Sequence, residues 1–426
     1  MRSRQLFAAL LVGLAALSGV SRADVVTDWN NVTLDAIRAK SINPPRATRL
    51  LAMVHVAIFD AINGIDRKFE PYEVQEQARK GALKQIAAAV AAHTVLVDQH
   101  PDLSDDFDAA LDVSLAQVSK GKGKRRGIQW GEYVGNRILE LRADDGADLV
   151  VPYTPSGEFG FWKPTPPGFL PALLPNWPYV KPFAMNGGSQ FRVVPPPAFS
   201  SDEYAQAFNE VKYLGDADSP LRTADQTQIA YFWEDGAGTV TPPGHWQVIA
   251  QQLVESPLFK VKPVDRARLF ALLSIVQADG AIVSWDNKYF YDHVRPYTAI
   301  TEEADDDGND DTSADPEWVN LIPTPPFPTY TSGHSTFSGG SSKLLALFFG
   351  TDDIPFSGES PDPLRWPDEL PGVVRQWNSL SQAAEEAGQS RIYGGIHWQY
   401  DNQEGLNSGR ALARFVFKNY LRPLKD

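Results

Sequence analysis

The sequence predicts an all-α fold, made of helical bundles and interrupted by a long Pro-rich irregular excursion. Hydrophobic residues recur three and four positions apart along most of the chain, which is the spacing of a buried helix face. Alternating runs bounded by hairpin turns are scarce. Hydrophobic residues make up 43% and aromatic residues 11% of the 426 residues, so we expect a globular protein with a large core.

The predicted helices form an N-terminal and a C-terminal set. One buried face of the first long helix is marked by Leu51, Val54, Ile58, Ile62 and Ile65. Further helical patterns cover 85–96, 107–118, 124–143, 201–214, 221–234, 243–256, 263–293, 333–349, 371–388 and 402–420. Residues 152–197 are dense in Pro, Gly and aromatic residues, which predicts an ordered excursion over the surface. We therefore expect a helical region at 24–200 that includes this excursion, and a helical bundle at 201–426.

The first residues have the features of a secretory signal peptide. Arg2 and Arg4 form a positive start, residues 6–20 are apolar, and residues 21–23 offer small side chains at both cleavage subsites. The alternative is a transmembrane anchor, but about 15 apolar residues are too few for a bilayer that needs ~20. We expect residues 1–23 to be removed on export to the periplasm or the medium, leaving a soluble mature protein without a membrane anchor.

Composition excludes several functional classes. The net charge is −14, which argues against nucleic-acid binding because that function needs basic patches. The chain has no cysteine, so thiol catalysis, iron–sulfur clusters, cysteine zinc sites and disulfides are excluded. If this acidic protein binds an anion, it must gather its cations in one place.

The first candidate segment is 285–296, which holds Lys288 and Arg295. These residues are seven apart, about two helical turns, so we expect both to project from one helix face toward one anion. Pro296 disfavours helix for the residue before it, so Arg295 should lie at the helix end. Taken alone, the pair fits a solvated surface helix better.

The second candidate segment is 323–339, where a Pro-rich approach leads to Ser332, Gly333 and His334 and then to an apolar helical run. Ser332 is suited to cap that helix, whose free amides and dipole make an anion site. Gly333 lets the backbone approach a ligand closely, and His334 can exchange protons near neutral pH. The alternative is a Ser-capped helix with an incidental histidine.

The third candidate segment is 390–401. Arg391 offers a planar, permanently charged fork that suits tetrahedral oxyanions. His397 can supply a nitrogen to a metal or a phosphorus centre, and Asp401, four residues later, would orient the imidazole from the same helix turn. The alternative is a structural histidine beside an aromatic residue.

The three segments together contain the parts of a single site for a multiply charged oxyanion. They resemble the signature of the vanadium-dependent haloperoxidases, whose superfamily includes bacterial acid phosphatases and type 2 phosphatidic acid phosphatases. That signature is Lys, six residues, Arg-Pro; then Pro-Ser-Gly-His; then Ser-Arg, five residues, His, three residues, Asp. This chain matches every spacing with Lys288, Arg295-Pro296, Thr331-Ser332-Gly333-His334, Ser390-Arg391, His397 and Asp401. Thr331 replaces the usual Pro, which we expect to loosen the turn without changing a ligand-contacting residue type.

The resemblance covers most of the mature chain and is strongest at 263–410. It implies two helical bundles of the vanadium haloperoxidase type, with vanadate as cofactor and phosphate as a competing analogue. It further implies that hydrogen peroxide, a halide and a small organic acceptor are the substrates. The metal would act as a Lewis acid without changing its oxidation state.

The resemblance also implies a role for each site residue. His397 would be the protein ligand to the metal, His334 the acid–base residue, and Lys288 a further catalytic cation. The groups that would hold the cofactor oxygens belong to Lys288, Arg295, Ser332, Gly333 and Arg391. Trp285 and Phe327 match positions on the halide side.

Two alternative functions remain open. In an acid phosphatase with the same pocket, His397 would be the nucleophile and His334 the proton donor to the leaving group. A non-catalytic protein that binds vanadate or phosphate would need the cations but not His334. A halogenation assay run beside a phosphatase assay would separate these functions.

Other polar residues are given structural roles. The acidic run 305–311 lacks a Glu at the spacing of a full calcium loop, so we expect a solvated turn. Asp279, within an apolar helix, is either a partner of one of the cations or a satisfied core carboxylate. The histidines that we expect to be structural are His55, His93, His100, His245 and His293.

Overall fold

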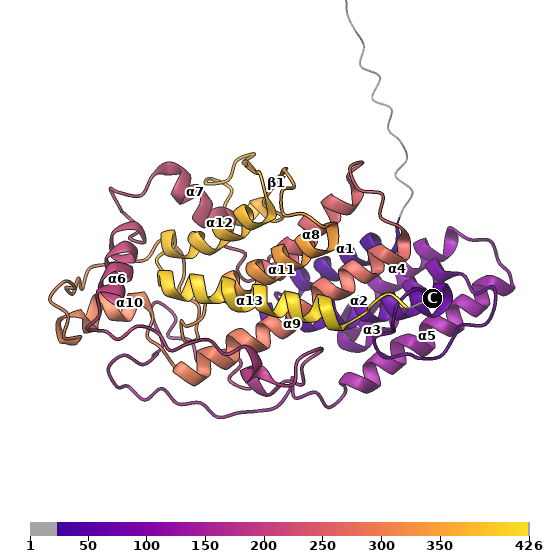
Figure 1. Cartoon of the computed structure of the whole chain (residues 1–426), viewed down its shortest axis with the longest axis horizontal. Helices are drawn as coiled ribbons and strands as arrows, with labels where there is room; N and C mark the ends of the chain where they lie inside the picture. The colour runs from indigo at the N-terminus through magenta and orange to yellow at the C-terminus, as the bar shows by residue number, and fades with distance from the viewer. Residues whose placement is uncertain (1–23, 425–426) are drawn as a thin grey trace, which may run out of the picture.

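Helices account for almost all the regular structure of the protein, which we describe from a computed structural model of residues 24–424 (Figure 1). Helix covers 57% of the chain and strand 3%, which confirms the predicted all-α class. The signal peptide predicted at 1–23 lies outside the described residues.

The N-terminal helices are α1 (Val25–Ala39), α2 (Pro44–Asp66), α3 (Lys84–Gln99), α4 (Ser104–Ala116) and α5 (Lys122–Arg142). After the excursion come α6 (Asp202–Leu214), α7 (Ala224–Phe232), α8 (Thr241–Glu255), α9 (Pro263–Tyr291) and α10 (Pro296–Thr298). The C-terminal helices are α11 (Gly333–Phe349), α12 (Leu380–Tyr393) and α13 (Gln399–Asn419). The two strands are β1 (Phe356–Glu359) and β2 (Val374–Trp377).

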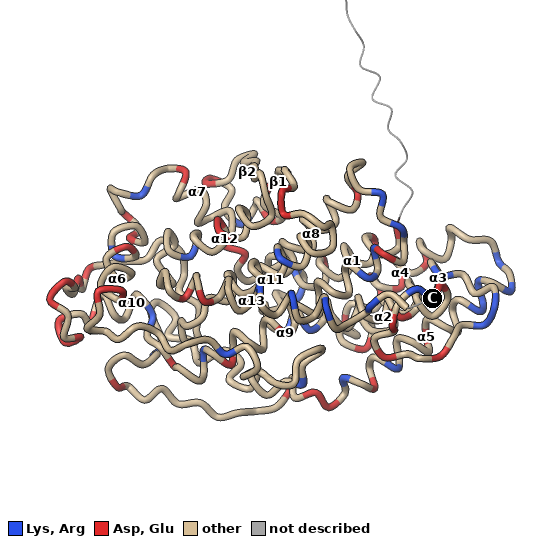
Figure 2. The backbone as a smooth tube through the Cα atoms, in the orientation of Figure 1, with Lys and Arg blue, Asp and Glu red and all other residues tan. Residues whose placement is uncertain are grey.

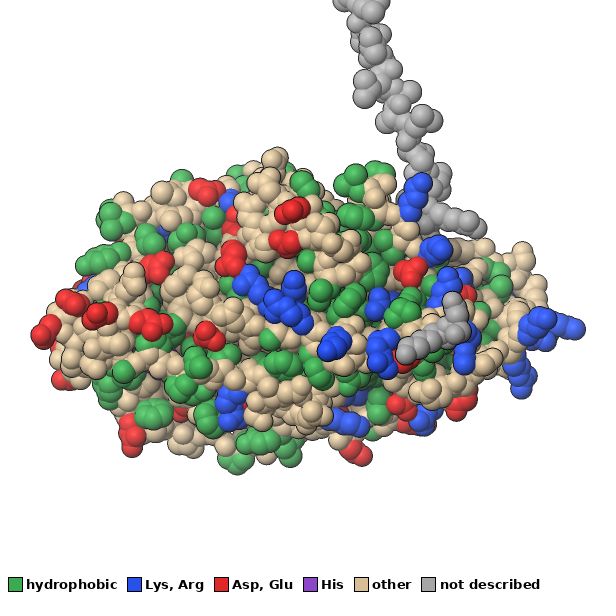
Figure 3. Space-filling model, in the orientation of Figure 1, with side chains coloured by type: hydrophobic (Ala, Val, Ile, Leu, Met, Phe, Trp, Pro, Cys, Tyr) green, Lys and Arg blue, Asp and Glu red, His purple; other side chains and the backbone are tan. Residues whose placement is uncertain are grey.

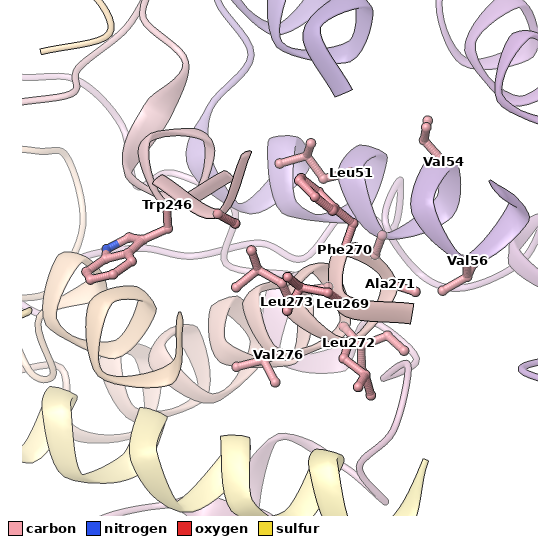
Figure 4. Close-up of a cluster of buried hydrophobic side chains, with 14 of the residues drawn as sticks. Leu51, Val54, Val56, Trp246, Leu269, Phe270, Ala271, Leu272, Leu273 and Val276 are labelled. Carbon is pink, nitrogen blue, oxygen red and sulfur yellow. The ribbon is translucent and has the colours of Figure 1, made fainter. Parts of the chain in front are cut away.

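The centre of the molecule is α9, which packs against α2 on one side and against α11 and α13 on another. Figure 4 shows the contact with α2, where Leu51 lies beside Phe270. By length and composition α2 and α9 are apolar enough to cross a membrane, but their apolar windows are 89% and 100% buried inside the protein. A helix that is apolar on all sides is typical of the core of a large protein, and the burial of α2 and α9 fits that role.

The end of α9 differs from the sequence prediction. Asp292 adopts a left-handed conformation (φ 49°) and ends the helix, and Arg295 follows in extended conformation as the residue that precedes α10. Pro296 disfavours helical geometry for Arg295. The expectation that Lys288 and Arg295 project from one helix face is therefore wrong, because Arg295 lies beyond the helix.

The helix predicted at 371–388 is also wrong in its first half. Gly372 turns the chain with φ 63°, and β2 then pairs with β1 as an antiparallel hairpin in which Phe356 lies opposite Trp377. Exposed and less exposed side chains alternate along β2, as they do in a half-buried strand. Helix α12 begins only at Leu380, after Ser379 caps it through the amide of Gln382.

The excursion at 152–197 contains two short 3₁₀ turns, Trp177–Tyr179 and Gly188–Phe191. Hydrogen bonds hold it to α9. Asp279 accepts hydrogen bonds from the amides of Phe183, Ala184 and Met185 at 2.7–2.9 Å. Asp279 is therefore a satisfied core carboxylate that anchors the excursion. This settles the choice between the two roles considered for it.

Charge is unevenly distributed along the molecule. Figure 2 shows acidic residues gathered at the end that carries α6 and α10, and basic residues near α5 at the opposite end, as does one face in Figure 3. In the acidic run, Asp307 accepts hydrogen bonds from the Asn309 amide and the Thr312 hydroxyl, which closes a turn. Among residues 24–424 no group of three or more His, Asp or Glu side chains is arranged to hold a metal ion.

Candidate active site

The three sequence segments meet where the C-terminal end of α9 approaches the first turns of α11 and α13. Arg295 Nη1 lies 3.2 Å from His397 Nε2, which joins the first segment to the third. Lys288 Nζ donates to the Thr331 carbonyl at 2.6 Å, which joins the first to the second. The Ser332 amide donates to the Asp401 carbonyl at 3.1 Å, which joins the second to the third.

Lys288 is fully buried and organises the approach to α11. Its ammonium donates to the carbonyls of Pro328, Thr329 and Thr331 at 2.6–3.0 Å, which uses all three of its protons. Thr331, which stands where the signature has Pro, takes the shortest of these bonds through its main chain. Burial and nearby Arg295 hold the pKa of Lys288 well below its ordinary value, whereas Asp401 opposes that shift.

The two arginines are held by main-chain carbonyls and keep donors free. Arg295 donates to Phe327 O and Ile396 O at 2.8 and 2.7 Å, and Arg391 donates to Trp233 O at 3.0 Å. The buried Arg295 Nη2 and Arg391 Nε have no hydrogen-bond partner among the residues that the structure describes. Burial lowers the pKa of both guanidinium groups, which still remain charged at neutral pH.

His397 is held in a defined tautomer by its neighbours. Its Nδ1 lies 2.8 Å from Asp401 Oδ2, which can only accept when ionised, so Nδ1 carries the proton. Nε2 faces the Arg295 guanidinium, a pure donor, and therefore presents a lone pair. Burial and the neighbouring cations hold the pKa of His397 well below its ordinary value, which keeps the imidazole neutral and able to act as a ligand or nucleophile.

Thr329 is a member of this group that the sequence analysis missed. Its hydroxyl lies 3.1 Å from His397 Nδ1 and donates to Asp401 Oδ2. The Trp398 amide donates to the same oxygen at 3.2 Å because Asp401 stands in the first turn of α13. Burial raises the pKa of Asp401 to about 6, against these hydrogen bonds and the charges of Lys288 and Arg295.

Ser332 caps α11 as predicted, since its side chain accepts from the Ser335 amide at 3.3 Å. The first residue of this 17-residue helix is Gly333, so its amide lies at the positive end of the helix dipole. His334 follows, and its Nε2 lies 3.2 Å from Glu234 O. Burial, Arg391 and Lys288 lower the pKa of His334, whereas the carbonyls of Glu234 and Trp233 oppose the shift.

Trp285 and Phe327 form an aromatic wall over the cations. Their ring centroids are 4.9 Å apart, and Lys288 Nζ lies 4.8 Å from the Phe327 centroid. Trp285 Nε1 donates to Leu173 O at 3.1 Å, so the excursion supports this wall. Both rings thus lie beside the cationic group, where an apolar surface strengthens electrostatic attraction.

A second set of residues missed by the sequence analysis is the turn that follows α7. Trp233 and Glu234 present their carbonyls to Arg391 and His334. Asp235 pairs with His245 at 3.0 Å, and both side chains are 2% exposed. Hydrogen bonds to main-chain atoms can form with any residue type, so the sequence carried little signal for this turn.

The other histidines that were expected to be structural lie outside this group. His55 contacts Asn30, His93 contacts Asp108, and His293 contacts Tyr400, each within hydrogen-bond distance.

The site fits a multiply charged oxyanion. Three buried cations converge, and within residues 24–424 none of them forms an ion pair with a carboxylate; main-chain carbonyls hold them instead. Two guanidinium nitrogens are buried without a partner, and a helix N-terminus and a neutral imidazole lone pair lie beside them. Burying unpaired charge is costly, so such an arrangement is suited to a bound anion.

Comparison with known proteins finds relatives among the vanadium-dependent haloperoxidases. Residues 268–426 match the family described as the VCPO second helical-bundle domain. The chain is 27% identical over 481 residues to a vanadium chloroperoxidase of Curvularia inaequalis, covering 88% of this chain and 78% of that protein. A bacterial vanadium-dependent iodoperoxidase has the same fold with a TM-score of 0.79 and 27% identity, over 94% of this chain and 97% of its own. A bacterial vanadium-dependent chloroperoxidase shares the fold at 16% identity, with a TM-score of 0.71 over 89% of this chain and 92% of its own.

Proposed function

The chain belongs to the vanadium-dependent haloperoxidase family, and we propose that it binds vanadate and oxidises a halide with hydrogen peroxide to a hypohalous acid that halogenates an organic acceptor. The observation that carries the proposal is a cluster of three buried cations, beside the Nε2 lone pair of His397, that form no ion pair with a carboxylate within residues 24–424.

The residues that would hold vanadate follow from their free donors. Within residues 24–424, Arg295 Nη2 and Arg391 Nε are buried without hydrogen-bond partners, and the Ser332 hydroxyl and the Gly333 amide would add two further donors. Lys288, whose three protons are taken by carbonyls, would contribute its charge. His397 Nε2 is the atom that would ligate the metal, because Asp401 and Thr329 hold the opposite nitrogen. When bound, vanadate supplies a Lewis acid that activates hydrogen peroxide.

His334 moves protons in this proposal. Oxidation of a halide by peroxide consumes one proton and releases one water, so the site needs a group that takes a proton from peroxide and returns one. The lowered pKa of His334 leaves its imidazole unprotonated at neutral pH, so that one ring nitrogen has a lone pair for a proton. Its contact with Glu234 O holds the ring in place.

Trp285 and Phe327 would form the halide side of the site. They provide an apolar surface within 6 Å of the Lys288 charge. A weakly hydrated halide is favoured on such a surface because the cations attract it more strongly where water is excluded.

The decisive experiment is a bromination assay with peroxide and bromide, with and without vanadate, run beside a phosphomonoesterase assay on the same sample. We expect bromination only when vanadate and peroxide are both present, and we expect phosphate to inhibit reconstitution competitively. High phosphatase turnover without halide oxidation would assign the site to the phosphatase chemistry instead, with His397 as the nucleophile.

Two variants test the residue roles. His397→Ala should abolish vanadate-dependent turnover with the fold intact. His334→Ala should still bind vanadate but lose ~10²–10⁴ in rate, the usual cost of removing an acid–base group. Wild-type turnover in either variant would refute the corresponding role.

We also propose that the protein is exported, on the basis of the positive start, apolar run and small residues in 1–23. N-terminal sequencing of the protein recovered from the periplasm or the medium should begin at or near Asp24. Recovery of the chain with Met1 in the cytoplasm would contradict export.

A further inference from the structure

The turn of residues 233–235, which follows α7, contacts the side chains of Arg391 and His334. Arg391 Nη1 donates to Trp233 O at 3.0 Å, and His334 Nε2 lies 3.2 Å from Glu234 O. The positions of one anion-binding cation and of the acid–base histidine thus depend on two consecutive carbonyl groups.

The turn is fixed on one side by the Glu234 carboxylate. Its Oε2 accepts from the Gly236 amide at 2.9 Å, from Arg365 Nε at 3.2 Å and from Trp366 Nε1 at 3.3 Å. These contacts hold the side chain of Glu234 against the segment that contains Arg365 and Trp366.

The other side of the turn is fixed by His245, which lies on α8. Asp235 adopts a left-handed conformation (φ 45°), which is uncommon for residues other than glycine and needs support from its surroundings. His245 Nδ1 lies 3.0 Å from Asp235 Oδ2, and the His245 ring stacks on Trp233 with centroids 4.4 Å apart. One side chain therefore braces both ends of the turn, one by a hydrogen bond and the other by stacking.

We propose that His245 is a positioning residue of this site: through Asp235 and Trp233 it fixes the turn whose carbonyl groups hold His334 and Arg391. The catalytic part of this inference rests on the proposed haloperoxidase function, whereas its effect on anion binding does not. Residues that orient the groups around a bound metal typically change affinity or activity by 10–100-fold when they are replaced.

Two substitutions separate the contacts that His245 makes. His245→Phe keeps a flat ring for stacking on Trp233 and removes the bond to Asp235. His245→Asn keeps a donor near the position of Nδ1 and removes the ring. We expect His245→Phe to lower kcat for bromide oxidation by ~10–100-fold with little change in the KM for bromide, and we expect His245→Asn to recover most of this loss.

The same variants are measured without peroxide or vanadate, by calorimetric titration with inorganic phosphate. We expect His245→Phe to weaken phosphate binding by ~10-fold, because Arg391 loses its fixed carbonyl, and His245→Asn to bind more tightly than His245→Phe. This readout remains if the native protein fails to oxidise halide, so failure of the proposed function and failure of the inference are distinguishable.

The matched control is His93→Phe, which breaks the His93–Asp108 pair (2.7 Å) in the N-terminal bundle. It should leave kcat and phosphate affinity unchanged. If His245→Phe does not fold, Asp235→Asn tests the same contact, because it tolerates the left-handed conformation but weakens the bond. Wild-type kcat and phosphate affinity in His245→Phe, or in Asp235→Asn, would overturn the inference.

Discussion

Gly405 allows α13 to approach the first turn of α11 directly beneath the anion site. A Cβ at this position would lie 2.8 Å from Ser332 O, 2.9 Å from Ser335 Cβ and 3.2 Å from the Thr336 nitrogen. Two of these neighbours are backbone atoms and cannot rotate away. Ordinary contact begins at 3.4 Å, so Gly405→Ala must displace the Ser332 carbonyl by about 0.6 Å.

This displacement predicts two measurable losses. Overpacking of a core contact lowers the free energy of unfolding by ~1–3 kcal/mol. The better helix propensity of alanine offsets at most ~1 kcal/mol of this loss. Because Ser332 and Gly333 lie at the displaced end of α11, we also expect weaker anion binding. A misplacement of 1 Å costs ~10²-fold in a reaction rate, so we expect phosphate affinity to fall on the order of 10-fold.

The assay is urea denaturation together with calorimetric phosphate titration, with Gly280→Ala as the control. A Cβ on Gly280 would meet its nearest neighbour, Thr336 Cγ2, at 3.7 Å, which is ordinary contact. Gly280→Ala should therefore gain up to ~1 kcal/mol from helix propensity and bind phosphate normally. The packing argument fails if Gly405→Ala matches the wild type in both measurements.

Three further predictions follow from individual contacts. Thr329→Val removes the hydroxyl beside the imidazole and should weaken vanadate binding by ~10–100-fold, whereas the buried control Thr33→Val should lose stability only. Sulfate affinity should fall as the pH rises toward the ordinary pKa of a lysine, because burial and Arg295 hold the pKa of Lys288 below that value and bound anion favours the ammonium; Lys288→Arg should flatten this dependence, and a flat profile in the wild type would contradict it. Asp279→Asn places an NH₂ group against backbone amides and should lose ~2 kcal/mol of unfolding free energy, whereas the exposed control Asp310→Asn should stay within ~0.5 kcal/mol.

The candidate residues of the anion site could be predicted from the sequence because their side chains are long, charged or titratable. Lys288, Arg391 and His397 carry their chemistry wherever the backbone places them, so their co-occurrence in three segments that resemble a known signature predicted that the segments meet. The hydrophobic spacing of 333–349 and 402–420 predicted the helices α11 and α13, but not that they pack against each other.

The parts that the sequence did not reveal depend on local backbone direction. Arg295 lies beyond α9 because Asp292 turns left-handed, which a count of residues per turn does not detect. Thr329 joins His397 across 68 positions of the chain, and the Trp233 carbonyl joins Arg391 across 158. Hydroxyl and carbonyl groups are too common for such pairs to be recognised before the fold is known.

The three cations make the anion-free protein less stable than the same fold with an anion bound. Two unit charges 4 Å apart repel by ~4 kcal/mol at an effective dielectric constant of 20. Main-chain carbonyls oppose the repulsion among the three cations, as do the carboxylates of Asp401, Glu234 and Asp235. An oxyanion that binds only the folded state stabilises it by ~2.7 kcal/mol at ~100 times its Kd. We therefore expect vanadate, phosphate and sulfate each to raise the thermal unfolding midpoint with increasing concentration, and chloride, which carries a single charge, to raise it less at equal ionic strength. In Arg391→Met the repulsion is smaller and one ligand group is lost. Vanadate should therefore raise the thermal unfolding midpoint of this variant by less than it raises that of the wild type. An Arg391→Met protein that gains as much from vanadate as the wild type would show that the buried charges do not drive anion binding.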